Sequence, residues 1–158
     1  MSEPRWAFTH SDDIRFGDLD SMGHLNNVAF LVLLESARVA YALSLDPDRD
    51  PVRPSGYGTV VAEVKLAYRS PGMFGERVDT RLRPEELGRT SLRIAAEMRV
   101  GDRLLADGYT VMVLVDPATT RPMPLPEHLR ERLIADGARP RESVEPLSQT
   151  SSGPFRSR

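Results

Sequence analysis

The chain has 158 residues, of which 40% are hydrophobic and 28% charged, and its formal net charge is −2. This length fits one ordinary domain with a substantial core, and the composition is that of a globular protein rather than a disordered or fibrous one. The sequence contains no cysteine, which excludes disulfides, thiolate metal sites and a cysteine nucleophile. Charges of both signs are interspersed without a basic stripe, which argues against nucleic acid as a partner.

Two features bear on location. The first residues, MSEPRWAFTHSDD, contain neither a basic segment nor an apolar one, so we expect no secretory signal and a cytoplasmic protein. The most apolar run, residues 28–45, includes Glu35 and Arg38, which a membrane span would tolerate poorly. We therefore expect a core helix there.

The first third of the chain predicts a strand, a helix and a loop. Residues 9–16 mix polar and apolar side chains and indicate a short strand. A helix follows, capped by Asn26 or Asn27 and ending near Leu45, because an asparagine side chain accepts a hydrogen bond from the first free N–H groups of a helix. Three prolines within residues 46–54 then predict a loop.

Four strands are predicted next, because the hydrophobic period changes to two. They cover about residues 59–69, 77–83, 92–100 and 104–115, with turns at residues 70–75, 85–88 and 101–102. The last strand is continuously apolar, as expected of a strand covered on both faces or lying at a subunit contact. The side chains expected to face inward from the first two strands are Val60, Ala62, Val64, Leu66, Tyr68, Val78, Thr80 and Leu82.

These elements predict an α+β fold in which a curved antiparallel sheet wraps around one long central helix. A short amphipathic helix is expected within residues 122–134. The remaining chain has few apolar residues and abundant Pro, Ser and charge, so we expect one domain over residues 1–136 and a disordered tail over residues 137–158. Pairing of open sheet edges across a two-fold axis would protect them, which predicts at least a dimer.

The segment RFGDLDSMGHLNN, residues 15–27, gathers candidate functional groups at the start of the apolar helix. Asp18 and Asp20 are two residues apart and would point the same way in an extended segment, and Gly23 permits a sharp turn. The start of a helix offers free N–H groups and a partial positive charge that can stabilise an oxyanion. Acyl transfer or hydrolysis is therefore one hypothesis; the plainer alternative is that the acids only cap the helix and shape the turn.

No metal site is predicted. An EF-hand beginning at Asp18 would lack oxygen ligands at its fifth and twelfth positions. Glu35 and Arg38, three apart on the helix, favour an ion pair or a solvated stripe, and a catalytic role for Glu35 is the alternative. The histidines have no metal-ligand spacing among them: His10, His24 and His128.

The run RFGDLDSMGHLNNVAFLVLLESAR resembles the N-terminal signature of the hotdog-fold acyl-CoA thioesterases of the 4-hydroxybenzoyl-CoA thioesterase-like family. That signature is an arginine or tyrosine, an Asp-x-Asp-x-x-Gly-His-x-Asn-Asn run and a helix carrying Glu-x-x-Arg. Weaker likenesses occur at residues 68–71, 88–91 and 124–126, and the resemblance covers about residues 14–133. It implies a helix wrapped by a five- or six-stranded sheet, a homodimer or homotetramer, and active sites at the protomer interface.

The resemblance also implies roles for particular residues. Asp20 would be the catalytic carboxylate, acting as nucleophile or general base, with Asp18 in support. Backbone N–H groups near Asn27 and Val28 would polarise the thioester carbonyl, and neither a metal nor a cofactor is implied. The residues that would shape the turn and orient water or substrate are Gly23, His24 and Asn27.

An acyl-CoA thioesterase is thus the leading prediction, and two alternatives stay open. One is a non-hydrolytic module that binds acyl-CoA or an acyl carrier protein. The other is a hotdog dehydratase or hydratase, in which an acid and a histidine act on the acyl chain. The acyl group is open as well, because many relatives have tyrosine where this chain has Phe30. Candidates for contact with CoA, chosen only as basic residues near the motifs, are Lys65, Arg69 and Arg89.

Overall fold

The computed structural model of the chain describes residues 5–53 and 55–141. Five antiparallel strands lie in the order β1-β3-β4-β5-β2, and the two-residue β6 pairs with β3 in parallel. The strands are β1 (Phe8–Asp13), β2 (Gly58–Tyr68), β3 (Arg77–Leu87), β4 (Ser91–Val100), β5 (Arg103–Val115) and β6 (Arg139–Pro140). The helices are the short 3-10 helix η1 (Phe16–Asp18), α1 (Asn27–Leu45) and α2 (Glu127–Ala135).

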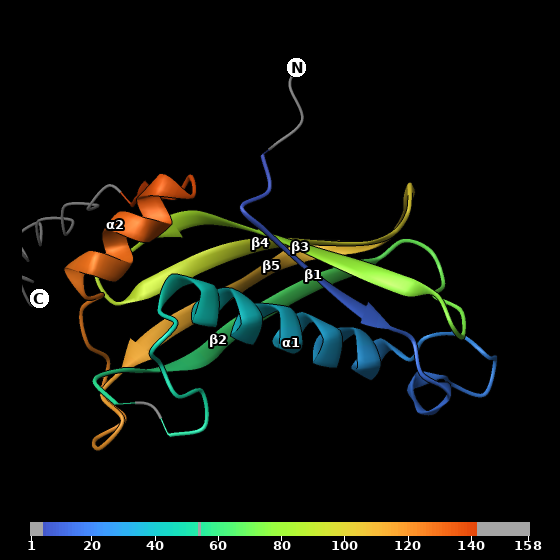
Figure 1. Ribbon diagram of the computed structural model, residues 1–158, viewed down its shortest axis with the longest axis horizontal. Coiled ribbons are helices and arrows are strands. Elements are labelled where there is room, and N and C mark those ends of the chain that lie inside the picture. The colour runs from blue at the N-terminus through green and yellow to red at the C-terminus, as the bar shows by residue number, and fades with distance from the viewer. Residues whose placement is uncertain (1–4, 54, 142–158) are drawn as a thin grey trace, which may run out of the picture.

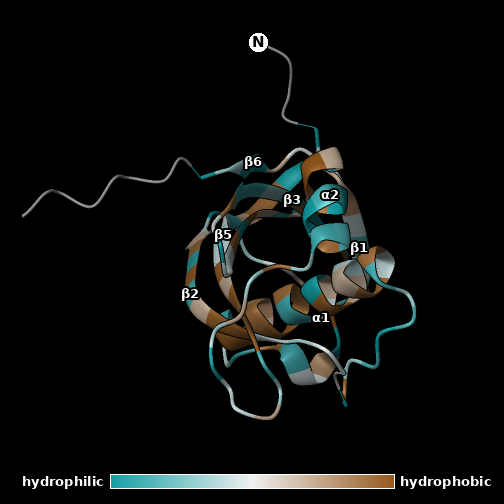
Figure 2. Ribbon diagram, turned by 90° about the vertical axis from the view of Figure 1, so that its left-hand side faces the viewer, coloured by the Kyte–Doolittle hydropathy of each residue, from teal (hydrophilic) through white to brown (hydrophobic). Residues whose placement is uncertain are grey.

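The helix α1 lies along one face of the sheet, and the sheet curves around it, as predicted (Figures 1 and 2). One core cluster joins Leu34 and Tyr41 of α1 to the sheet and to α2; a second, around Ile14, Leu25 and Phe30, lies beneath the start of α1. By length and composition α1 could cross a membrane. In this chain, however, its buried side chains form the core, as the prediction of a core helix requires.

The predicted alternation is confirmed in β3 and β4, where Val78, Thr80, Leu82 and Ile94 are buried. The end of β3 was predicted wrongly. The strand continues to Leu87 rather than turning at residues 85–88, because a bulge between Pro84 and Glu86 interrupts the alternation while pairing to β4 continues.

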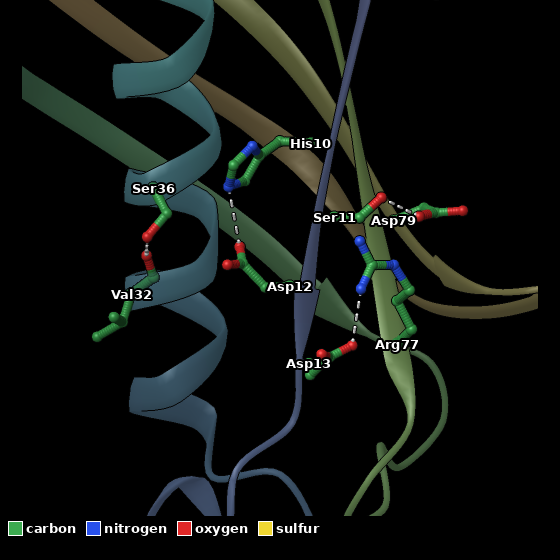
Figure 3. Close-up of polar contacts among 8 residues, drawn as sticks. All are labelled: His10, Ser11, Asp12, Asp13, Val32, Ser36, Arg77 and Asp79. Atoms are coloured by element: carbon green, nitrogen blue, oxygen red, sulfur yellow. Dashed lines mark hydrogen bonds and ion pairs between the residues drawn. The ribbon is translucent and has the colours of Figure 1, made fainter.

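The first strand ends three residues earlier than predicted, at Asp13, and η1 follows. Figure 3 shows how β1 is attached to β3: the Ser11 hydroxyl donates to Asp79 (2.6 Å), and the Arg77 guanidinium pairs with Asp13 (3.1 Å). On the side of β1 that faces α1, the same figure shows His10 Nε2 at 3.4 Å from the carboxylate of Asp12.

The strand β2 differs most from its prediction. Most side chains expected to face inward are exposed in this single chain, Val60 at 47% and Val64 at 38%, and only Leu66 is half-buried. The strand is the sheet edge beside β5, whereas α1 packs along β1 and β3 at the other side. A bulge between Val61 and Glu63 also breaks the alternation. The prediction that β2 is half-buried is therefore wrong for a single chain.

The C-terminal boundary lies later than predicted. Helix α2 forms where expected and buries Leu129 and Leu133. The next residues were assigned to a disordered tail, yet Ala138 is buried and the Arg141 N–H donates to the Leu87 carbonyl (2.7 Å), because β6 pairs with the end of β3. Residues 142–158 of the predicted tail lie outside the described residues.

Candidate functional site

The loop between η1 and α1 forms a tight hairpin at the N-terminal end of α1. Leu19 and Leu25 face each other as a bridge, the Asp20 N–H donates to the His24 carbonyl (2.8 Å), and the Gly23 N–H donates to the Asp20 carbonyl (3.1 Å). Gly23 has φ +75°, a conformation that glycine adopts at little cost. The sharp turn predicted at this glycine is present.

Asp20 lies in this hairpin with one carboxylate oxygen held and the other available. Its Oδ1 accepts the N–H groups of Met22 (2.9 Å) and His24 (3.1 Å). Within residues 5–53 and 55–141, no group donates a hydrogen bond to Oδ2. The turn therefore fixes the direction of a carboxylate that is exposed at the surface of the chain.

Asp18 is engaged differently, because Arg15 occupies both of its oxygens. The Arg15 guanidinium donates to the carboxylate at 3.0 and 2.8 Å, and the Arg15 N–H donates at 2.9 Å. The side-chain hydrogen bond from Arg15 lowers the pKa of Asp18 below its ordinary value. Asp18 also ties the loop to the helix, since its carbonyl accepts the Asn26 N–H (2.8 Å).

The first turn of α1 is capped as predicted by Asn26, whose side-chain oxygen accepts the Val28 N–H (2.9 Å). The Val28 N–H is thereby occupied. In a helix the first N–H groups lack intrahelical partners, so Asn27 and Ala29 supply the remaining donors of this turn. The hydroxyl of Tyr68 reaches the same turn from β2 and donates to the Asn27 carbonyl (3.3 Å).

A second loop, residues 70–76, packs against the hairpin and bonds to its backbone. The Leu25 N–H donates to the Gly72 carbonyl (2.8 Å), and His24 pairs with Met73 as a bridge. Gly72 is buried, and a Cβ atom there would lie 2.7 Å from Cδ1 of Ile14. An alanine there would displace the end of the Ile14 side chain, so glycine suits this close approach of the loop.

The structure brings the residues predicted for the site into one hairpin and one helical turn: Asp18, Asp20, Gly23, His24, Asn27 and Val28. The sequence reasoning did not assign Tyr68 and Gly72 to this site. The Tyr-Arg-Ser-Pro stretch at residues 68–71, one of the weaker likenesses to the family, was the available signal. Phe30, considered as a possible pocket residue, is buried beneath the turn with its ring 5.1 Å from that of Tyr68.

Among the described residues, no group of three or more His, Asp or Glu side chains is placed to hold a metal ion. His10 lies on β1 beside Asp12, His24 in the hairpin and His128 on α2. Glu35 lies beyond the first two turns of α1 and lines a separate cavity with Arg38. The site at the helix start therefore consists of a carboxylate, backbone N–H groups and a tyrosine hydroxyl.

Comparison with known proteins agrees with this architecture. The family profile described as "Thioesterase-like superfamily" matches residues 14–133. A curated relative, the 1,4-dihydroxy-2-naphthoyl-CoA hydrolase of Synechococcus elongatus, is 28% identical over 125 residues, which cover 76% of this chain and 90% of that protein.

Solved structures give the same result. A Thermus thermophilus thioesterase, solved in complex with coenzyme A and Zn, is 34% identical and superposes with a TM-score of 0.72, covering 83% of this chain and 94% of that one. A protein of the thioesterase superfamily from a Jannaschia species is 28% identical, with a TM-score of 0.74 and 83% of each chain covered. The chain belongs to the thioesterase-like superfamily, a family of thioester-hydrolysing enzymes, and has the hotdog fold.

Proposed function

We propose that this protein hydrolyses an acyl-CoA thioester to a carboxylic acid and CoA, with Asp20 as the catalytic carboxylate. The observation that carries the proposal is the state of Asp20. Two backbone N–H groups orient the carboxylate through Oδ1, and Oδ2 has no donor within the described chain. A carboxylate positioned in this way at a helix start is prepared to act on a polarised carbonyl.

Two chemical routes fit this arrangement. In the first, Asp20 attacks the thioester carbonyl, CoA leaves as a thiolate that takes a proton, and water hydrolyses the resulting anhydride. In the second, Asp20 accepts a proton from water, the hydroxide attacks the carbonyl, and the tetrahedral intermediate expels CoA. In both, N–H groups of the first turn stabilise the oxyanion. Because the Val28 N–H already donates to Asn26, we assign this role first to the N–H of Asn27.

Asp18 and Tyr68 act as positioning residues in this proposal. Asp18 holds Arg15 and the start of the hairpin, and Tyr68 holds the first turn through the Asn27 carbonyl. His24 contributes its backbone N–H to Asp20, and the residue is partly exposed, so its side chain is accessible to water or substrate. Neither route needs a metal or a redox cofactor.

A second copy of the chain would complete the site. Apolar side chains of β2 and of the outer face of α1 are exposed in one chain: Val28, Leu31, Val32, Val60 and Val64. The edge of β2 is also unpaired on its outer side. A homodimer formed across β2 and α1 would pair this edge and bury these side chains. We propose this dimer as the minimum assembly, with a tetramer as a possible dimer of dimers.

The CoA carrier and the cytoplasmic location predicted from the sequence belong to the same proposal. The Thermus thermophilus structure contains coenzyme A, and the Synechococcus elongatus relative acts on a CoA thioester. These relatives support CoA over a carrier protein. The acyl group of that hydrolase is aromatic, so aromatic acyl-CoAs belong among the first substrates tested.

The test is steady-state release of CoA thiol from short, medium, long and aromatic acyl-CoAs. We expect Asp20→Asn to lower kcat by about 10²- to 10⁴-fold, because the amide keeps an oxygen for the turn but can neither attack nor accept a proton. Asp13→Asn is the control, since Asp13 is an exposed carboxylate on β1 outside the site. Thermal unfolding of each variant separates lost chemistry from lost fold.

Two outcomes would contradict the proposal. Full activity of Asp20→Asn would remove Asp20 from the chemistry. Calorimetric binding of acyl-CoA by the unmodified protein with no product from any substrate would instead favour the non-hydrolytic binding module. That alternative draws support from the fact that both hydrogen bonds of Asp20 remain within its own turn.

A further inference from the structure

A cavity of about 210 Å³ lies between the second half of α1, the 46–53 loop and β2, away from the hairpin that carries Asp20. Its wall is mostly apolar, with Val39, Leu43, Val61 and Met112 among its lining residues. A cavity of about 150 Å³ can hold benzene, so this one accommodates a ring with one substituent. Ligand pockets are usually larger, which fits a subsite for the end of a ligand.

Two arginines on this wall, the buried Arg38 and the half-buried Arg49, have no carboxylate partner among the described residues. Arg38 is 9% exposed, and its one hydrogen bond goes from Nη1 to the Thr110 hydroxyl at 3.3 Å. Within the described part of the chain, no carboxylate lies within 4.0 Å of the guanidinium of Arg38 or of Arg49. Arg49 Nε is buried without any hydrogen-bond partner. Buried arginines are normally paired, because an unpaired buried charge is costly.

The surroundings explain why neither cation is neutralised from within the chain. Burial lowers the pKa of Arg38, and the charge of Glu35 only partly opposes this effect. Glu35 lines the same cavity but is exposed and lies beyond ion-pair distance. Near Arg49, the Asp46 carboxylate already accepts the Tyr57 hydroxyl (3.2 Å), and the Arg49 guanidinium lies over the Tyr57 ring (4.5 Å). The cavity therefore keeps a net positive lining.

We infer that this cavity is a subsite for a carboxylate-bearing end of the acyl group, held by Arg38 and Arg49 with its apolar part against Val39, Leu43 and Met112. A carboxylate accepts charge-assisted hydrogen bonds from guanidinium groups and supplies the partner that the two arginines lack. This inference rests on the proposed function for the identity of the ligand as an acyl-CoA. It assigns the substrate class as thioesters whose acyl group carries a second, free carboxylate.

The separation of the cavity from the hairpin decides the choice of substrates. Val39 follows Asn27 by twelve residues, which corresponds to roughly 18 Å along α1. A short acyl group held at Asp20 would therefore not reach the cavity of the same chain, whereas a long one could. The substrate panel must contain both.

The first experiment measures binding without catalysis. Benzoate is titrated calorimetrically into the full chain, with benzyl alcohol as a neutral ligand of similar size. We expect benzoate to bind at least about tenfold more tightly, and Arg38→Met and Arg49→Met each to weaken benzoate by about tenfold, because each removes a charge-assisted hydrogen bond. Arg53→Met, an exposed arginine of the same loop that does not line the cavity, is expected to leave binding unchanged.

Glu35→Gln and thermal unfolding test whether Arg38 binds a ligand or instead forms an ion pair with Glu35 of its own or a second chain. If the arginines await a ligand, Glu35→Gln tightens benzoate binding by roughly threefold through loss of a nearby negative charge, and Arg38→Met does not lower Tm. If Glu35 of either copy is the true partner of Arg38, both variants lower Tm or loosen the dimer and benzoate affinity does not rise. That result would overturn the inference, as would equal binding of benzoate and benzyl alcohol.

The second experiment compares CoA thioesters of α,ω-dicarboxylic acids with monocarboxylic acyl-CoAs of equal carbon number, from short to long. We expect kcat/KM to favour the dicarboxylic member by about tenfold at the matching length, and Arg38→Met to abolish this preference. Equal hydrolysis of dicarboxylic and monocarboxylic thioesters, together with no benzoate binding, would contradict the proposed subsite without contradicting the thioesterase function. Arginine-dependent benzoate binding without hydrolysis of any thioester would support the subsite and contradict the thioesterase function.

Discussion

The two edge strands of the sheet, β1 and β2, differ in length and in the polarity of their side chains. β1 has six residues, and its sequence FTHSDD carries charge and hydroxyl groups, with Ser11 and Asp13 bonded across to β3. β2 has eleven residues, is rich in valine and leaves Val60, Val61 and Val64 exposed. The edges lie on opposite sides of α1 (Figure 2).

A short, charged edge discourages pairing with another chain, whereas a long apolar edge invites it. Within one sheet, β1 is therefore a protected edge and β2 is the edge proposed to pair with a second copy. The strand β2 also lies beside the candidate site, because Tyr68 at its end reaches the start of α1.

The largest effect is expected at the close contact between β2 and β5. A Cβ atom on Gly108 would lie 1.9 Å from the Lys65 carbonyl oxygen, so Gly108→Ala must separate the two strands. We expect the free energy of unfolding to fall by about 3 kcal/mol or more. Gly101→Ala is the control, because Gly101 has φ +56° but open space, and only backbone strain of about 1 kcal/mol is expected there. If urea denaturation showed the same loss of unfolding free energy for both variants, the close contact between Gly108 and Lys65 would be contradicted.

The next effect concerns assembly. A lysine at Val60 would place a charge on the outer edge, so Val60→Lys is expected to weaken the dimer by roughly 100-fold and to lower turnover with it. Thr9→Lys introduces the same charge on the exposed side of β1 and should leave the fraction of dimer unchanged. Sedimentation velocity at several concentrations measures both. A dimer that resists Val60→Lys but dissociates with Thr9→Lys would reverse the roles of the edges.

A smaller effect is expected at alkaline pH. The Tyr109 hydroxyl of β5 donates to Glu63 of β2 (2.6 Å), and this hydrogen bond raises the pKa of Tyr109 above its ordinary 10.0. The folded pKa exceeds the unfolded one, so the stabilisation is fully present below pH 10.0 and disappears as pH rises through the folded pKa. Tyr109→Phe should reduce the slope of stability against pH in that range. An unchanged slope would show that the bond does not stabilise β2.

The smallest effect is expected on β1. Arg77 and Asp13 form an ion pair whose two side chains are 64% and 66% exposed. Solvent screens such pairs, so Arg77→Ala is expected to change the free energy of unfolding by no more than about 0.5 kcal/mol. Denaturant titration at low and high salt measures it. A loss above about 1 kcal/mol would mean that charge pairing, and not only the short length of β1, secures this edge.

Local patterns predicted a large part of this molecule. The cap at Asn26, the turn at Gly23 and the buried face of β3 follow from side-chain chemistry within a few residues, and all three are present. The predicted inward face of β2 was wrong, because a period of two indicates which side chains share a face and not whether another element covers that face. The same limit hid the close approach of Gly72 to Ile14, which is distant in the sequence.

The sequence by itself determined the two α-helices and the five longer strands, the polar hairpin before α1 and the resemblance to a thioesterase family, since these depend on residues that are neighbours in the chain. Only the tertiary structure decided that β2 returns to pair with β5, that Tyr68 meets the first turn of α1, and that Arg38 and Arg49 line one cavity. These contacts join segments far apart in the sequence. Their geometry depends on the curvature of the whole sheet and on bulges that no local pattern specifies.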